Sequence, residues 1–78
     1  MHYVFYKVHT RDIFAIKFII DAYENMMALS TIDQNTGKVQ ITIAPDLLTD
    51  AERILADLET RFFMQRLNED PTRSQGQY

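Results

Sequence analysis

The side chains best suited to metal binding in this chain are two histidines, because the sequence contains no cysteine. His2 and His9 lie at opposite ends of a segment whose alternating pattern predicts a strand. A strand rises about 3.3 Å per residue, so the two imidazoles cannot bind one metal ion together. We therefore expect no metal site and no cofactor, and the lack of cysteine also excludes a disulfide framework.

The segment His9, Thr10 and Arg11 is the candidate for ligand binding. It precedes a predicted helix, where free backbone N–H groups and the Arg11 guanidinium can hold a small anion. Every helix start offers the same donors, so the plain alternative is that Thr10 is an N-cap and Arg11 faces solvent. Binding of a small molecule at this place therefore competes with ordinary helix capping.

The acidic residues Asp46, Asp50 and Glu52 lie close together in the sequence. Paired carboxylates act as general acids and bases only in a cleft that shifts their pKa. Here Thr49 and Glu52 match a capping box at the start of a second helix, which explains the cluster without catalysis. The sequence contains no HExxH motif, glycine-rich phosphate loop or nucleophile–base pair. It therefore predicts that the protein is not an enzyme.

Charge and hydropathy exclude two further classes of function. A formal net charge of −3 disfavours a nucleic-acid binder, which normally presents a basic face. An RNA-recognition module would also need aromatic residues on two central strands, and only Tyr3 and Phe5 on the first strand qualify. The apolar runs are far shorter than the roughly 20 residues that span a bilayer, and the N-terminus resembles no secretory leader. We expect a cytoplasmic protein without a membrane segment.

Alternating and helical patterns predict the elements that position these residues. A first strand is expected over residues 2–8, followed by a helix to Tyr23 or Glu24. The residues of the strand that face the core are Val4, Tyr6 and Val8. The apolar stripe of the helix consists of Ile13, Ile16, Ile19, Ile20 and Tyr23. Phe14 and Phe18 lie one turn apart and outside this stripe, so they need a separate partner.

A β-hairpin is predicted after Asn25, and its register decides which residues face the core. A four-residue loop over residues 34–37, with Gly37 supplying a positive φ, pairs Asp33 with Lys38 and Ile32 with Val39. This register assigns Ala28, Ser30 and Ile32 to the core face. It assigns Met27, Leu29 and Thr31 to the opposite face. A slip of one residue would exchange the two sets.

A second helix begins near Thr49 and is expected to stop at Asn68. Its apolar face consists of Ala51, Ile54, Leu55, Leu58 and Phe62. The predicted fold is an α+β two-layer sandwich, a ferredoxin-like β-α-β-β-α arrangement with a three-stranded antiparallel sheet and two helices on one face. We expect one domain over residues 1–70 and a disordered tail over 71–78.

Without a fourth strand, the edge of the first strand would be bare, and the open face of the sheet would carry an apolar patch. The expected interface residues are Tyr3, Phe5, Met27, Leu29, Phe14 and Phe18. An exposed apolar patch that combines this many large side chains usually marks an interface in a soluble protein. We therefore expect a homodimer or docking to a larger protein.

Four short motifs resemble a known family. They are Arg11-Asp12-Ile13, the run from Lys17 to Asn25, Ser30-Thr31-Ile32-Asp33 and Thr36-Gly37. Over roughly residues 2–60 they resemble a short bacterial domain family of unknown function, which implies no catalytic residues. At the level of fold the chain is also similar to ACT regulatory modules, which implies dimerisation and binding of an amino acid or anion. Where those modules have a glycine after the first strand, this chain has His9-Thr10-Arg11.

Overall fold

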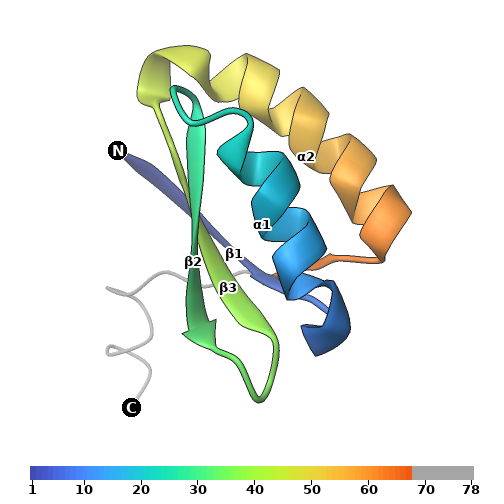
Figure 1. Ribbon diagram of the computed structural model, residues 1–78. Helices are drawn as coiled ribbons and strands as arrows, with labels where there is room; N and C mark the ends of the chain where they lie inside the picture. The colour runs from blue at the N-terminus through green and yellow to red at the C-terminus, as the bar shows by residue number, and fades with distance from the viewer. Residues whose placement is uncertain (68–78) are drawn as a thin grey trace.

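A computed structural model describes residues 1–67 and shows two layers, a four-stranded sheet and two helices that cover one of its faces (Figure 1). The elements follow the order β1 (His2–Lys7), η1 (Thr10–Asp12), α1 (Ile13–Asp21), β2 (Met27–Asp33), β3 (Lys38–Ile43), η2 (Pro45–Leu47), α2 (Leu48–Phe62) and β4 (Gln65–Leu67). The strands lie in the order β2-β3-β1-β4, and each is antiparallel to its neighbours. The predicted α+β architecture is confirmed at this level.

The prediction of three strands was wrong, because β4 pairs with the edge of β1. Phe5 lies opposite Leu67, and Lys7 lies opposite Gln65. The predicted helix to Asn68 was also too long, since α2 ends at Phe62 and Phe63 adopts a left-handed conformation with φ of 54°. That conformation costs a residue with a side chain about 1–2 kcal/mol, and here it turns the chain back toward the sheet.

The predicted hairpin register was half right. Asp33 lies opposite Lys38 as expected, but Val39 lies opposite Thr31, because an irregularity between Thr31 and Asp33 leaves Ile32 without a partner. Such a bulge inserts one residue and exchanges the two faces of the strand beyond it. Met27 and Leu29 therefore point into the core, 2% and 6% exposed, instead of lying on the open face.

The core lies between the sheet and the helices, and it contains most of the residues predicted for β1 and for both helices, joined by Met27 and Leu29 of β2. The prediction was wrong for Tyr23, which is 39% exposed because α1 ends before it. Val4, Tyr6 and Val8 of β1 are buried. The buried residues of the helices are Ile13, Ile16, Ile20, Ala51, Leu55 and Leu58. From β3 come Val39, Ile41 and Ile43.

Neither predicted helix cap forms. The turns η1 and η2 precede the helices, and the residues at the caps of α1 and α2 are Asp12 and Leu47, neither of which makes a side-chain capping bond. Helix α1 also ends at Asp21, slightly earlier than predicted. A single turn of 3-10 helix lets the chain enter each helix without the side-chain acceptors that Thr10 and Thr49 were expected to supply.

No helix within residues 1–67 is long and apolar enough to cross a membrane. The tail predicted over 71–78 lies outside the described residues, as does the end of the predicted domain at 68–70.

Candidate functional site

The outer face of helix α1 carries the most exposed apolar side chains among the helices. Phe14 and Phe18 are 78% and 80% exposed, while Ile13, Ile16 and Ile20 of the same helix are buried on its opposite side. The expectation that the two phenylalanines lie off the core stripe is confirmed. An aromatic pair in water, one turn apart, is unusual on a helix whose other face is already satisfied.

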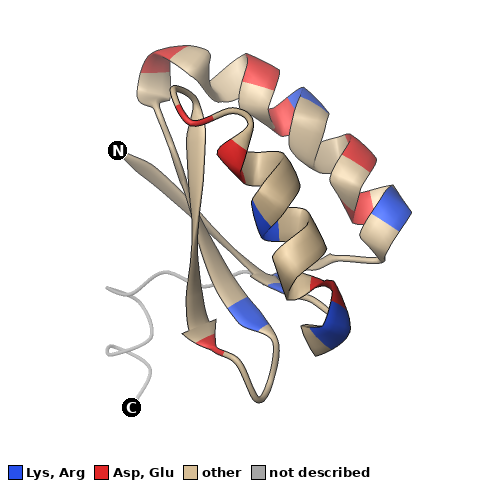
Figure 2. Ribbon diagram, viewed as in Figure 1, with Lys and Arg blue, Asp and Glu red and all other residues tan. Residues whose placement is uncertain are grey.

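The rest of that face is small or charged. Ala15 and Ala22 are exposed beside the phenylalanines. Lys17 and Asp21 are the only charged residues of α1, and their side chains form an i, i+4 ion pair of 3.2 Å at about half exposure. Figure 2 shows the contrast with α2, whose ribbon carries acidic and basic residues along its length. We call Phe14, Ala15, Phe18 and Ala22 the α1 patch.

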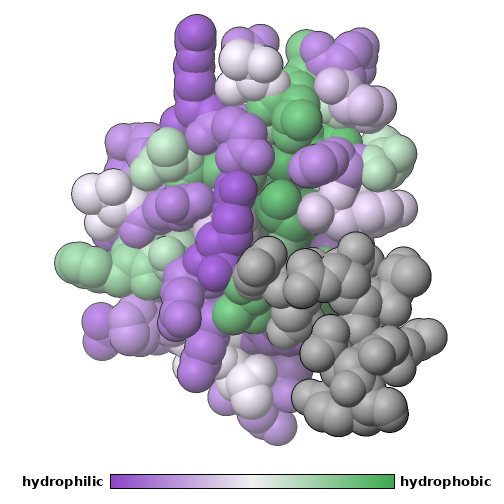
Figure 3. Space-filling view, turned by 180° about the vertical axis from the view of Figure 1, so that it is seen from behind, coloured by the Kyte–Doolittle hydropathy of each residue, from purple (hydrophilic) through white to green (hydrophobic). Residues whose placement is uncertain are grey.

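The open face of the sheet is less apolar than predicted, because two members of the expected patch lie in the core. Tyr3 remains 53% exposed, but Phe5 is buried, with the Lys38 ammonium 5.6 Å from the centre of its ring. Seen from behind in Figure 3, polar side chains run across the molecule between smaller hydrophobic areas. Of the six predicted interface residues, the structure therefore exposes Tyr3, Phe14 and Phe18.

A polar cluster that the sequence did not reveal joins β4 to α2. Tyr6 is fully buried and its hydroxyl donates to the Glu59 carboxylate at 2.5 Å. Arg66 donates to the same hydroxyl at 2.7 Å and to Glu52 at 2.7 Å. The cluster depends on β4, because Arg66 lies opposite Tyr6 in that pairing. The signal in the sequence was a tyrosine on the predicted core face, because a buried tyrosine hydroxyl usually finds a hydrogen-bond partner.

The charges of this cluster explain two shifted pKa values. Burial, followed by the hydrogen bond to Glu59, raises the pKa of Tyr6 far above its ordinary 10.0. The hydrogen bond to Glu52 raises the pKa of Arg66, so the guanidinium stays charged. Within residues 1–67 no buried side-chain nitrogen or oxygen lacks a hydrogen-bond partner, and the bonds of this cluster join β1, β4 and α2, which favours a structural role that fixes the sheet to the helix.

Replacing Tyr6 by phenylalanine is expected to destabilise the protein by about 1–3 kcal/mol, because Glu59 loses a donor in a partly buried place. Because folding raises the pKa of Tyr6, the stability that its neutral phenol contributes is fully present below pH 10 and falls as the pH rises above that value. Urea unfolding at pH 7 and above pH 10 measures both effects. Tyr3→Phe is the control because Tyr3 is exposed. Equal stability of the two variants would contradict the structural role of the Tyr6 hydroxyl.

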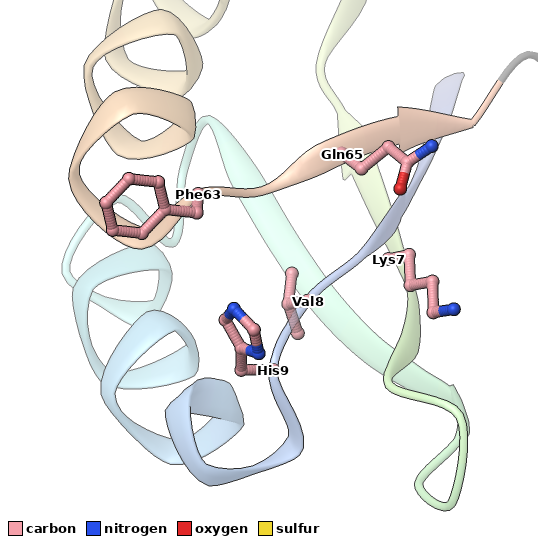
Figure 4. A pocket seen from close by; sticks show the side chains of 5 residues that line it. All are labelled: Lys7, Val8, His9, Phe63 and Gln65. Atoms are coloured by element: carbon pink, nitrogen blue, oxygen red, sulfur yellow. The ribbon is translucent and has the colours of Figure 1, made fainter.

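A shallow cavity of about 260 Å³ opens where β1 and β4 diverge. It is lined by Lys7, Val8, His9, Phe63 and Gln65. Figure 4 shows His9 and Phe63 on one side, whereas the side chains of Lys7 and Gln65 point away from them. Of the predicted ligand segment only His9 lines this cavity, and anion binding by His9, Thr10 and Arg11 stays a prediction.

A second cavity of about 300 Å³ lies at the turn after α1, beside Tyr23 and Leu47. Within residues 1–67 no group of three histidine or acidic side chains is placed to hold a metal ion.

These features define a small two-layer α+β domain whose helix α1 presents apolar residues to solvent. The chain belongs to the family described as domain of unknown function DUF4911, whose model matches residues 6–61. The expectation of a family without an assigned function is confirmed. No curated protein and no solved structure matches the chain.

Proposed function

We propose that this protein is a ferredoxin-like association module that binds a second copy of itself through the α1 patch. The strand order β2-β3-β1-β4, with both helices on one face, supports the ferredoxin-like description. The observation that carries the function is the exposure of Phe14 and Phe18, 78% and 80%, on a helix that already has a complete core stripe.

The α1 patch suits an antiparallel copy of itself. Phe14, Phe18 and Ala22 form one i, i+4 row, the kind of ridge by which helices pack. With a two-fold axis near Phe18, Phe14 of one chain lies against the small Ala22 of the other. The same axis brings Lys17 near both Lys17 and Asp21 of the second copy, and because each Lys17 is paired with its own Asp21, the flanking charges do not oppose the contact.

The size of the patch indicates a weak dimer if it acts alone. A buried phenylalanine contributes about 150–250 Å², so two on each chain give roughly 600–1,000 Å² in total. Stable interfaces bury about 1,200–2,000 Å². We therefore expect a dimer that forms and dissociates with concentration, unless a second surface contributes.

Association is favoured over the alternative of small-molecule sensing. The cavity beside His9 presents few converging polar side chains, while ligand sites usually combine an enclosed apolar pocket with several of them. A homodimer is also the commonest arrangement for a soluble oligomer. The proposal assigns the protein no catalytic step.

The test is molar mass by light scattering during size exclusion, over a hundredfold dilution. The wild-type mass is expected to rise from 9.2 kDa toward twice that value with concentration. The double variant Phe14→Ser/Phe18→Ser is expected to remain at the monomer mass, its dissociation constant raised at least about tenfold.

Phe63→Ser is the matched control, because Phe63 is 79% exposed at a different place. It is expected to dimerise like the wild type, and circular dichroism should show all variants folded. Equal loss of dimer in both variants would indicate unspecific hydrophobic contact. A wild type that stays monomeric at every concentration would refute the proposal.

A further inference from the structure

Strand β2 forms the free edge of the sheet opposite β4. Its seven residues pair with β3 on one side, and within residues 1–67 no strand lies on the other. An edge of this length is a ready template for another strand, and proteins usually protect it with charged residues or proline. From Met27 to Ile32 this strand contains neither.

The ladder shows which backbone groups of β2 point outward. The Ala44 amide donates to the Met26 carbonyl, and hydrogen-bonded pairs alternate along antiparallel strands. Ala28 and Ser30 therefore direct their backbone groups toward β3, and Leu29 and Thr31 direct theirs away from it. Met27 agrees with this alternation, because its amide donates to the Tyr23 carbonyl rather than to β3.

We propose that β2 pairs antiparallel with β2 of a second copy, about a two-fold axis that passes beside Ser30. The inference rests on the proposed self-association and names its second surface. In this register the outward backbone N–H and C=O groups of Leu29 pair with those of Thr31 in the second copy. By symmetry, the outward groups of Thr31 pair with those of Leu29 in the second copy. Four backbone hydrogen bonds then join two four-stranded sheets into one of eight strands.

The side chains around this axis fit such a pairing. Ser30 is exposed and small, so it can lie opposite its own copy at the close spacing of a non-hydrogen-bonded pair, about 4.5 Å. Ala28 comes opposite Ile32 of the second copy, an apolar contact for a side chain that is otherwise 50% exposed. No charged residue meets a like charge.

The two-fold axis beside Ser30 is also compatible with contact between the two α1 patches. Helix α1 packs against β2, whereas α2 is fastened to β4 at the far edge by Arg66 (Figure 1). A dimer through the β2 edge therefore brings the two α1 helices toward each other on the helical side of the sheet. Edge pairing and the α1 patch together supply the area that the patch alone lacks.

Amide hydrogen exchange, residue by residue, tests the pairing on the full chain. At concentrations where light scattering shows dimer, the amides of Leu29 and Thr31 are expected to exchange at least about tenfold more slowly than after dilution to monomer. The amides of Ala28 and Ser30, already bonded to β3, should be protected at both concentrations and serve as internal controls.

A matched pair of variants gives an independent readout. Thr31→Pro removes an outward amide and should lower the dimer fraction, whereas Thr31→Val keeps that amide and should dimerise like the wild type. If Thr31→Pro does not fold, the exchange experiment on the wild type still decides.

Three outcomes would overturn the inference. A dimer sensitive to Phe14→Ser/Phe18→Ser, but with Leu29 and Thr31 exchanging equally at both concentrations, would leave the proposed function intact and exclude the β2 edge. Protection of both amides that dilution does not change would mean that the chain covers its own edge. A protein that is monomeric throughout would refute both proposals.

Discussion

The variant Leu29→Glu is expected to unfold the domain. Leu29 is 6% exposed and lies opposite Ile41, which is fully buried, so the substitution places a carboxylate among aliphatic side chains. Losing a buried leucine costs about 2–5 kcal/mol, and burying an uncompensated charge adds several more. The total equals or exceeds the net stability of a small domain, about 5–15 kcal/mol.

Circular dichroism and a one-dimensional proton spectrum measure the effect, and Ala28→Glu is the control. Ala28 is the preceding residue on the same strand, but it is exposed on the other face, so its variant should fold. A folded Leu29→Glu together with an unfolded Ala28→Glu would show that β2 lacks the bulge at Ile32. The register expected from the loop length alone would then hold in solution.

The variant Gly37→Ala is expected to lose about 3 kcal/mol or more of stability. Gly37 has φ of +80°, a conformation that costs a residue with a Cβ about 1–2 kcal/mol. An added Cβ would also lie only 2.0 Å from the Val8 carbonyl oxygen. Relief of that overlap would displace the hairpin loop from β1 and stretch the bond from the Val8 amide to the Gly37 carbonyl, now 2.9 Å.

Urea unfolding of Gly37→Ala beside Gln34→Ala separates this steric effect from a general weakening of the loop. Gln34 lies in the same loop and is exposed, so its replacement should change stability by less than about 0.5 kcal/mol. Equal stability of the two variants would mean that the loop does not pack against Val8.

Local patterns determined the parts of this protein that depend on near neighbours along the chain. The alternation of Val4, Tyr6 and Val8 identified the core face of β1, and the isoleucines at helical spacing identified that of α1. The loop before Lys38, closed by Gly37, was also correct. In each case a side chain takes its direction from the period of its own element, so the sequence alone is sufficient.

The two main errors of the sequence-based prediction concern features that leave no periodic pattern of apolar residues. A bulge adds one residue at Ile32, and nothing local distinguishes it from regular pairing. It is the burial of Met27 and Leu29 against the helices that favours it. Strand β4 has only three residues, too few to show an alternating apolar and polar pattern. Its place is set by its pairing with β1 and by the hydrogen bond from Arg66 to the Tyr6 hydroxyl.

The residues of the candidate site also fall into two groups, those that the sequence predicted correctly and those that only the tertiary structure placed. That Phe14 and Phe18 lie off the core stripe follows from helical spacing alone, and their exposure agrees with it. The tertiary structure decided that Met27 and Leu29 leave the open face. It also decided that, within residues 1–67, β2 rather than β1 has a free edge. Strand pairing joins residues distant in sequence, so its register and its edges are set by the burial they achieve together.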